Sequence, residues 1–533
     1  MASICRTSAL QASSPKPAHP TNPSRSSRYK NTMYPAEYGG GYGVMNFTLK
    51  SGTNQYHGDL FEFLRNDKFD ARGFFARSKS MLRQNEFGGT FGGPLVLPKL
   101  YNGKDRTFFF AAYSGFRLRG GIAAGNLQTL PTTQQRTGDF SDYPFPLFDP
   151  ASTRPDGSGG STRDPFVNNR IPANRFSGVA QRTLPLIPQP DIPGYFNNYI
   201  NRQSQPSTDD DWSLKVDHQI NSKQRISAAY WWVNGNTQIN GPVAGELNPG
   251  YRNTPTEASG YRFNHTYTIS PTLLNRVGIG YTPTSPTWSR WTLDPRLGNK
   301  VMQIPGIPQD VHGYPQLSFT GATSYATLGN ANNNGTDPQF FQNWSGQDDV
   351  TWVKGPHQVK FGVMWRRREM TVLDRRNEGG SFTFSGLSTS LPNSSNFSNW
   401  GNPFASFLLG ETFSANAAVP APLRHYKDDF MATYAEDVIK LAPRVNLSVG
   451  LRYELPLYAK EKEGIVSFLD LSKPNPGAGG RPGALVFLGQ GEGRTGTYSI
   501  FGSFHTGYSP RIALTYGLDN KTVLRMGYGI FRI

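Results

Sequence analysis

The stretch "WSLKVDHQINSKQRISAAYWWV", residues 212–233, has the pattern of two strands joined by a tight turn. Successive side chains of a strand point to opposite faces, so residues two apart share one face. The apolar face would hold Trp212, Leu214, Val216 and Ile220 before the break NSKQ (221–224), and Ile226, Ala228, Tyr230 and Trp232 after it. The stretch therefore predicts an antiparallel hairpin with one apolar and one polar face.

Four more hairpins of this kind follow along the chain. Each has two alternating segments around a break of about three to five residues, the usual length of a hairpin turn. The paired segments are 262–269 with 273–281, 349–354 with 359–366, 430–440 with 445–454, and 511–517 with 522–531. No comparable helical periodicity occurs; 402–411 (NPFASFLLGE) is the best helix candidate, and it is short. We expect an all-β, antiparallel protein.

The connections between hairpins are long, in contrast to the tight turns within them. Segments 234–260, 282–346, 368–428 and 456–506 are rich in Gly, Pro, Asn and Ser. A soluble sandwich also shows period-two alternation, but loops of this size are abnormal inside a compact soluble domain. Strands of about 9 to 11 residues with short turns at one end and long loops at the other favour an outer-membrane β-barrel. The tight turns should then lie at the periplasmic rim, and the segments near 160, 245, 310, 390 and 480 at the extracellular rim.

Composition agrees with a strand-rich protein. Of 533 residues, 13% are aromatic and 17% charged, against about 25% charged in an ordinary domain. The net charge of +16 would suit a nucleic-acid partner, but the basic residues are scattered and residues 1–33 alone contain Arg6, Lys16, Arg25, Arg28 and Lys30. We therefore expect no nucleic-acid partner, and a disordered or aberrant tail over 1–33. Cys5 is the only cysteine, which excludes an internal disulfide.

No motif predicts an enzyme, a cofactor or a metal site. The eight histidines (19, 57, 218, 265, 313, 357, 425 and 505) lack the spacings of a metal-binding helix, and no G-x-S-x-G occurs. Three clusters remain as weak candidates: the Asp209–Asp211 run for a cation, the Gly39–Gly43 stretch, and the Arg366–Arg368 run for an anion such as a lipopolysaccharide phosphate. The favoured interpretations are solvated acids, a tight turn and an exposed charge cluster, respectively.

Strand alternation also predicts which side chains meet lipid. Phe61 and Phe63 share a face opposite Glu62, so we expect the two rings to face lipid and the carboxylate to face a wet lumen. Trp231, Trp232, Tyr281, Trp365, Tyr453 and Tyr458 lie near strand ends and would suit the aromatic girdles of a membrane barrel.

The stretch "AEYGGGYGVMNFTLKSGTNQYHGDLFEFLRNDKFDARGFF", residues 36–75, resembles the plug-to-barrel junction of TonB-dependent outer-membrane receptors, Oar-like branch. Val44, Asn46 and Lys50 match the last strand of the plug. The residues that match the opening of the barrel are Ser51, Gly52, Thr53, Asn54, His57 and Gly58. Segments 83–95, 104–117, 169–184 and 434–454 resemble later strands and a loop of the same family.

The resemblance implies residues 34–50 as the end of a plug domain and 51–533 as a partial barrel. It implies energy-dependent uptake of a solute, with outer-membrane lipid and the TonB complex as partners. Relatives have a signal peptide, a TonB box, a full plug and about 22 strands, whereas only about thirteen or fourteen strands are visible here. We therefore expect a fragment in which a strand near 56–65 cannot close against 522–531 as the family's last strand would.

Two other functions stay open. A surface adhesin or structural outer-membrane barrel would use the long loops to bind cells or polymers. A soluble basic β protein would bind nucleic acid. The composition of the loops names no ligand, and no ligand-binding residue is assigned.

Overall fold

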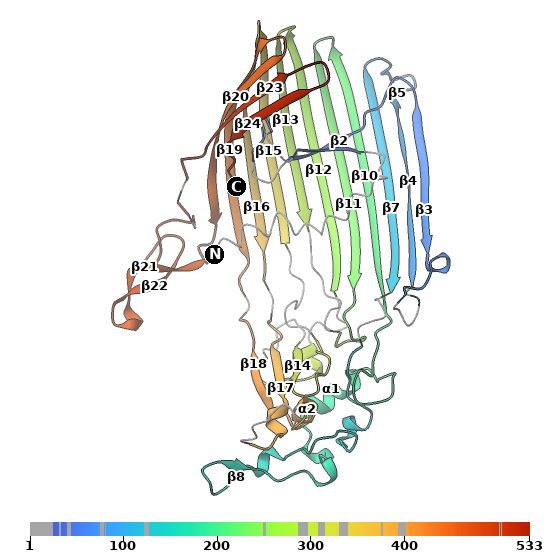
Figure 1. Cartoon of the computed structure of the whole chain (residues 1–533), viewed down its shortest axis with the longest axis vertical. Helices are drawn as coiled ribbons and strands as arrows, with labels where there is room; N and C mark the ends of the chain where they lie inside the picture. Colours follow the sequence, from blue (N-terminus) through green and yellow to red (C-terminus); the bar gives the residue numbers. More distant parts are fainter. Residues whose placement is uncertain are drawn as a thin grey trace.

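The computed structural model describes residues 25–30, 34–39, 44–74, 79, 81–121, 127–248, 252–285, 297–307, 315–329, 339–374, 377–392, 401–419, 421–499, 501–502 and 504–532. Within these ranges thirteen strands form one antiparallel sheet in the order β24-β23-β20-β19-β16-β15-β13-β12-β11-β10-β7-β4-β3. Each strand pairs with its next neighbours in the chain order of the sheet, without a crossover. The sheet curves around a concave face, and the other elements lie mostly at one end of it (Figure 1).

The strands of the sheet are β3 (His57–Asn66), β4 (Leu82–Pro94), β7 (Thr107–Gly121), β10 (Ser204–Asn221), β11 (Gln224–Ile239), β12 (Arg252–Ser270), β13 (Leu273–Ser285), β15 (Gln339–Lys354), β16 (His357–Val372), β19 (Arg424–Ala442), β20 (Val445–Glu461), β23 (Tyr508–Gly517) and β24 (Val523–Gly529). All five predicted hairpins are present. In the described chain β3 and β24 pair on one side only, so the sheet is an open arc.

The connections confirm the predicted asymmetry. Short turns such as 222–223, 271–272, 355–356 and 443–444 lie at one end of the strands, at the top of Figure 1. The long connections emerge at the other end; the segment near 310 lies outside the described residues. Many strands exceed the expected 9 to 11 residues, and β12 and β19 each have 19. The physical reason is that strand pairing continues past the apolar band into polar sequence on the extracellular side.

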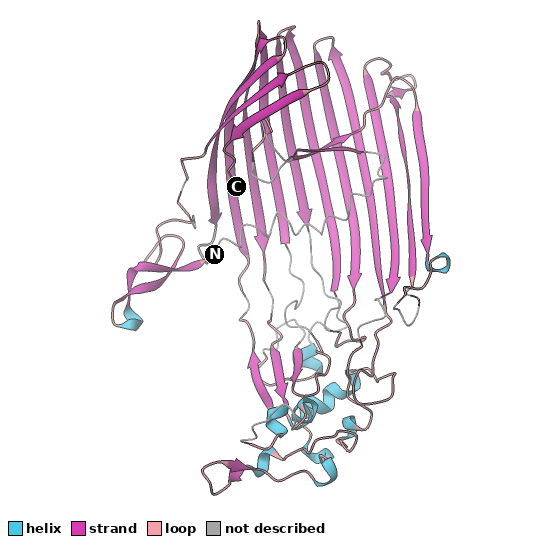
Figure 2. Ribbon diagram, viewed as in Figure 1, coloured by secondary structure: helices cyan, strands magenta, loops and turns pink. Residues whose placement is uncertain are grey.

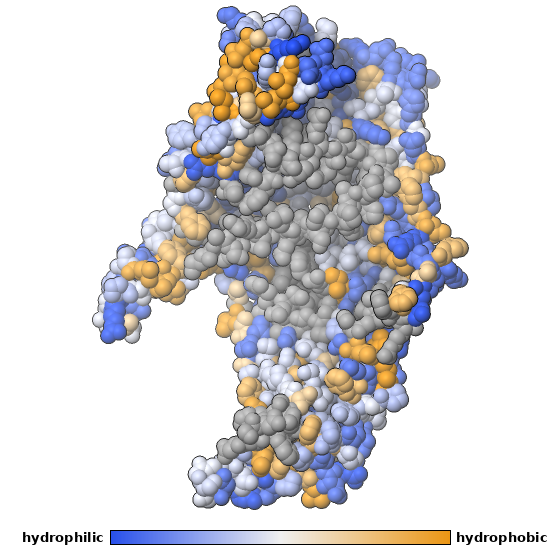
Figure 3. All heavy atoms as spheres, viewed as in Figure 1, coloured by the Kyte–Doolittle hydropathy of each residue, from blue (hydrophilic) through white to orange (hydrophobic). Residues whose placement is uncertain are grey.

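The outward face of the sheet carries exposed apolar side chains. Trp212, Phe361 and Ile512 are 50%, 46% and 48% exposed, and cross-strand pairing places them on one face. Figure 3 shows apolar side chains gathered over the β23–β24 hairpin. A soluble protein does not leave so large an apolar surface in contact with water, so this face fits a hydrocarbon environment. No helix among the described residues is long and apolar enough to cross a membrane.

Aromatic rings form a ladder across the outward face. The ring centroids lie 4.5 Å apart for Tyr113–Trp212, 5.1 Å for Tyr230–Tyr261, 6.1 Å for Tyr261–Tyr281 and 4.0 Å for Tyr281–Trp344. Such a ladder is typical of the interfacial girdle of a membrane barrel. Trp231, a predicted girdle residue, instead faces the lumen, where its indole fills the space beside Gly260.

The prediction for Phe61 and Phe63 is wrong. Glu62 pairs with Phe87, which is outward, whereas Phe61 pairs with Gly88. A Cβ built on Gly88 would lie 2.8 Å from the Phe61 ring, so the missing side chain makes room for that ring on the lumen face. Leu60 and Leu64, 93% and 65% exposed, are the apolar residues of this strand that face outward. Both faces of β3 carry apolar residues, and only the register on β4 distinguishes them.

Part of the N-terminal expectation also needs correction. Residues Arg25–Lys30, expected to be disordered, form β1, which pairs antiparallel with β2 (Val44–Leu49). In Figure 1 β2 lies across the concave face of the sheet. The other residues of 1–33 lie outside the described ranges.

The extracellular connections contain ordered elements of their own. The predicted helix is confirmed as α2 (Pro403–Leu409), and α1 (Gly178–Thr183) lies in the segment after β7. The minor strands of these connections are β8 (Arg154–Pro155), β9 (Ser161–Thr162), β14 (Gln316–Thr320), β17 (Ser381–Ser385), β18 (Thr412–Asn416), β21 (Ser467–Asn475) and β22 (Arg481–Phe487). Two more, β5 (Val96–Leu97) and β6 (Tyr101–Asn102), lie in the connection from β4 to β7, at the end of the short turns. Figure 2 shows most of the helices gathered below the sheet.

This topology makes a labelling prediction. In a Cys5→Ser background, a membrane-impermeant maleimide should label Ser158→Cys and Lys473→Cys on intact cells, because both positions are exposed in extracellular connections. Lys223→Cys and Lys521→Cys, in the tight turns, should react only after the outer membrane is permeabilised. Labelling of the tight turns on intact cells would invert the topology.

Candidate functional site

The lumen face of the sheet is polar where the outward face is apolar. Its buried side chains include Asp217, Asp349, Arg452 and Glu454. Buried charges are stable only when they are paired or hydrogen-bonded. The lumen wall is therefore a candidate site, and the question is what its charges contact.

The segment 34–39 lies against this wall and is held through its backbone. The amide of Ala36 donates to Glu436 Oε2 at 2.7 Å, and Ser448 Oγ donates to Glu436 Oε1 at 2.7 Å. Arg452 Nη1 donates to the carbonyl oxygens of Ala36 and Glu37 at 3.3 and 3.2 Å. Ala36 is fully buried. Strands β19 and β20 thus satisfy backbone groups that would otherwise be buried without partners.

Arg452 is the most deeply buried cation of this contact, with 1% of its side chain exposed. Its Nε donates to Glu454 Oε1 at 2.7 Å. Gly39 passes so close to this pair that a Cβ on it would lie 2.2 Å from Glu454 Oε1. Removing one partner of a buried pair costs about 3–5 kcal/mol, because the other charge stays buried and uncompensated. The segment and the ion pair therefore depend on each other.

Glu37 is the anionic contact of the segment. Its carboxylate forms an ion pair with Lys360 on β16, and Arg276 on β13 lies 3.9 Å from Glu37 Oε2. Arg276 also lies 3.6 Å from Asp349 Oδ2, and Tyr434 OH donates to Asp349 Oδ1 at 2.5 Å. The segment therefore joins an ionic network that spans four strands, β13 to β19.

Arg511 on β23 holds the start of the segment. Its Nη1 donates to the carbonyl oxygens of Tyr34, at 3.0 Å, and Pro35. Its guanidinium carbon lies 5.2 Å from the centroid of the Tyr34 ring and 4.5 Å from that of Phe531. Five strands of the sheet, β13, β16, β19, β20 and β23, therefore contact residues 34–39.

The S-G-T-N motif explains how the chain leaves the lumen and enters the sheet. Lys215 Nζ donates to Ser51 Oγ at 2.8 Å. A Cβ on Gly52 would lie 2.2 Å from the carbonyl oxygen of Phe109, so only glycine fits this crossing. Asn54 accepts from the amide of Asp105 at 2.9 Å, which fixes it to the turn before β7. Ser51, Gly52 and Asn54 thus each fix the position of the chain, which the motif alone does not predict.

Neither of the two charge runs identified in the sequence forms a single ion-binding site. Asp209–Asp211 lies within β10 rather than in a loop, and alternation turns Asp210 outward, where it pairs with Arg117 at 2.8 Å. The Arg366–Arg368 run is likewise split between faces. Arg367 pairs with Asp429 and Arg368 with Asp428, at 2.8 and 2.7 Å. Neither run therefore presents several free charges to one ligand.

The long connections form a packed unit, here called the loop assembly, from residues 127–203, 240–248, 297–307, 315–329, 377–392 and 401–411. It contains the main hydrophobic core of the described chain. The core includes Leu130, Phe140, Leu147, Met302, Leu317, Phe319, Phe384, Phe404 and Phe407. A Gly-, Pro- and Asn-rich composition suggested loops without a core, but sparse aromatic residues from distant segments supply one.

Buried polar groups fix the packing of this core. Tyr325 OH donates to Gln135 Oε1 and accepts from Asn402 Nδ2, both at 3.0 Å. Asn402 Oδ1 also caps α2 by accepting from the amides of Phe404 and Ala405. Burial raises the pKa of Tyr325 well above its usual value, so the hydroxyl stays protonated. These contacts join the segment after β7 to the segments after β13 and β16.

Ion pairs brace the surface of the loop assembly. Arg175 pairs with Asp149 at 2.9 Å and holds the pKa of that carboxyl below its usual value. The backbone amide of Ser141 lowers the pKa of Asp139 to about 2. Arg163 donates to the carbonyl oxygens of Leu387, Ser388 and Ser390. The assembly is therefore built as a defined structure at the extracellular end of the sheet.

The two regions differ in chemistry, with ion pairs and hydrogen bonds in the lumen wall and an apolar core in the loop assembly. Within the described residues, no three His, Cys, Asp or Glu side chains converge to hold a metal ion. The lumen wall holds residues 34–39 through hydrogen bonds and ion pairs. The sequence did not indicate this network, since its members come from six strands and are brought together only by the register.

The core of the loop assembly makes a stability prediction. Phe404→Ala should destabilise the assembly by about 3–5 kcal/mol, because the side chain is fully buried among Phe140, Phe319 and Tyr325. Limited trypsin digestion of the detergent-solubilised protein should then cleave the assembly at least about 100-fold faster, while the sheet stays intact. Phe69→Ala, at a side chain 83% exposed, is the matched control and should change nothing. Equal cleavage of both variants would show that the assembly has no cooperative core.

Comparisons with known proteins place the sheet in a family. Several solved structures of outer-membrane receptors are similar to the chain. The ferric-catecholate import receptor Fiu of E. coli K12 (TM-score 0.44) is 10% identical, with 95% of this chain and 59% of that chain covered. The transporter YddB of Escherichia coli (TM-score 0.44) is 11% identical, with 94% of this chain and 55% of that chain covered. A mutant ferric enterobactin receptor PfeA of Pseudomonas aeruginosa (TM-score 0.43) is 10% identical, with 94% of this chain and 58% of that chain covered.

The chain thus spans between half and three-fifths of the length of these receptors. No curated protein matches the sequence. The prediction of an outer-membrane barrel protein is confirmed at the level of the family, and the Oar-like branch stays a prediction. The profile of the family described as "Outer membrane beta barrel domain" matches residues 48–532, which include all thirteen strands of the sheet and their connections. The chain belongs to the outer-membrane β-barrel domain family.

Proposed function

We propose that the chain is the barrel part of an outer-membrane receptor that takes up a solute with energy supplied through TonB. Residues 34–50 are the end of its plug domain and residues 51–533 form barrel wall and loops. The outer membrane of a Gram-negative bacterium is its location, and outer-membrane lipid is its surrounding partner. The proposal assigns no enzymatic activity, cofactor or nucleic-acid partner.

The observation that carries the proposal is the ionic contact between segment 34–39 and the lumen wall. A passive pore or an adhesin has no need to hold a separate chain segment inside its lumen. Here Glu436, Arg452 and Arg511 bind backbone groups, and Lys360 binds the Glu37 carboxylate. Contacts of this kind are stable at rest yet can exchange with water, as expected for a plug that moves.

The loop assembly, at the extracellular end of the sheet, also supports the receptor role. Its packed core would hold the extracellular surface in one arrangement, and preorganised loops bind a ligand at a lower entropic cost than disordered ones. The wall and the loop assembly together would form a gated path. The solute stays unassigned, because no side chain of the loop assembly singles out a siderophore, a vitamin or a glycan.

Uptake measurements in the source bacterium test the proposal. We expect deletion of the gene to abolish uptake of one class among labelled ferric siderophores, cobalamin and oligosaccharides. A protonophore should abolish the same uptake in wild-type cells, because TonB draws on the proton-motive force. A plasmid copy should restore it.

A test variant carries Lys360→Met in the plasmid copy, with the wild-type plasmid copy as its control. It leaves Glu37 without its β16 partner, and we expect it to reach the outer membrane but to restore uptake incompletely. Loss of surface attachment with unchanged uptake across the panel would instead establish the adhesin. Uptake that resists the protonophore would exclude coupling to TonB.

A further inference from the structure

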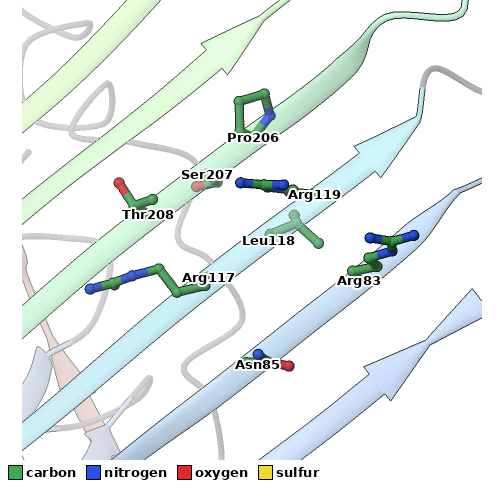
Figure 4. Close-up of a pocket in the computed structure, with 8 residues that line it drawn as sticks. All are labelled: Arg83, Asn85, Arg117, Leu118, Arg119, Pro206, Ser207 and Thr208. Carbon is green, nitrogen blue, oxygen red and sulfur yellow. The ribbon is translucent and has the colours of Figure 1, made fainter.

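Three arginines gather on the outward face of the sheet at the extracellular ends of β4 and β7. Arg83, Arg117 and Arg119 alternate in register with the outward residues Phe87 and Tyr113. They line a shallow hollow with Asn85, Pro206 and Thr208 (Figure 4). The lumen wall and the loop assembly do not include this hollow.

Two of these arginines oppose each other directly. Arg83 and Arg119 are cross-strand partners in an unbroken antiparallel register. Partners of this kind have Cβ atoms about 4.5–5.5 Å apart, and like charges there are destabilising. Both side chains are exposed, and neither has an acidic partner among the described residues. The pair therefore lowers the stability of the sheet unless an anion lies between the two guanidinium groups.

Arg117, the third arginine of the hollow, differs from Arg83 and Arg119 because a carboxylate neutralises it. Its Nη2 donates to both Asp210 oxygens, at 2.8 and 3.0 Å, and Tyr113 OH donates to the same carboxylate. The Asp210 carboxylate thus neutralises Arg117, and no carboxylate among the described residues pairs with Arg83 or Arg119. At the same end of β4, the described residues of the connection from β3 include Lys68, Arg72 and Lys79 as well as Asp67 and Asp70.

The position of the pair along the strand identifies its surroundings. Tyr113 and Trp212 belong to the aromatic ladder that marks the edge of the apolar band. Arg119 lies six residues beyond Tyr113 toward the extracellular end of β7, which is about 20 Å along the strand. At that level the outward face meets the headgroups of the outer leaflet rather than acyl chains, which would make an unpaired arginine costly.

We propose that Arg83 and Arg119 bind a phosphate group of the phosphorylated glycolipid of the outer leaflet, lipopolysaccharide. A guanidinium group donates two parallel hydrogen bonds to a phosphate, and two such groups on facing strands can hold one phosphate between them. Asn85 and Thr208 provide neutral donors beside the pair. The acyl chains of the same lipid would lie on the exposed faces of Trp212 and Leu214.

The test is lipid binding by the full chain, purified in detergent and freed of lipid. The probes are bisphosphorylated lipid A, the same lipid after removal of both phosphates, and inorganic phosphate, each measured by equilibrium titration. We expect wild-type protein to bind the bisphosphorylated lipid at least about 10-fold more tightly than either other probe. Arg83→Gln with Arg119→Gln should remove this preference, and Arg83→Lys with Arg119→Lys should retain part of it, because lysine keeps the charge but loses the bidentate geometry.

The control variant is Arg367→Gln with Asp429→Asn, which removes a neutral ion pair from the same outward face. It should bind like the wild type. A second measurement uses the melting temperature in detergent without phosphate, where Arg119→Gln should raise it by relieving the repulsion. The proposal is overturned if the glutamine variant keeps the preference, if inorganic phosphate binds as tightly as the lipid, or if Arg119→Gln lowers the melting temperature.

Discussion

A lipid bilayer provides no hydrogen-bond partner for a backbone amide or carbonyl group, so a chain that crosses it must satisfy those groups internally. Within the described chain, the eleven inner strands of the thirteen-strand sheet meet this constraint by pairing on both sides, whereas the edge strands β3 and β24 pair on one side. The pairing then determines which side chains meet which surroundings, since outward positions within the apolar band face hydrocarbon and inward positions face the lumen. Exposed Trp212 and Phe361 on one face and buried Asp349 and Arg452 on the other are two consequences of one pairing pattern.

As a result, the buried ion pairs and the hydrophobic core lie in different parts of the molecule. The described residues of the wall contribute no member to the hydrophobic core, and several of its buried charged side chains form an ionic network around residues 34–39. The main hydrophobic core of the described chain lies in the loop assembly, among Phe319, Phe404 and Phe407. The lumen contact is polar, whereas the core of the loop assembly is apolar.

The amino-acid sequence predicted the hairpins and the two rims because period-two alternation and turn length are local properties. It failed where the answer depends on register or on distant partners. Phe61 and Phe63 were assigned to lipid, but Gly88 opposite Phe61 places them in the lumen. The run Arg366–Arg368 looked like one cluster, and alternation separates it, whereas Arg83 and Arg119 are 36 positions apart and meet across two strands. No local pattern in the sequence predicts the network around residues 34–39, because its members lie far apart along the chain.

The central claim is that alternate residues of each strand face hydrocarbon and lumen. Spin labels at single cysteines from Ile226 to Trp232 on β11, in a Cys5→Ser background reconstituted in lipid vesicles, test it most directly. Accessibility to oxygen, which concentrates in hydrocarbon, should peak at positions 226, 228, 230 and 232, and accessibility to a water-soluble nickel chelate at 227, 229 and 231. Oxygen and nickel accessibilities that vary in phase, or that peak in the opposite order, would contradict the account.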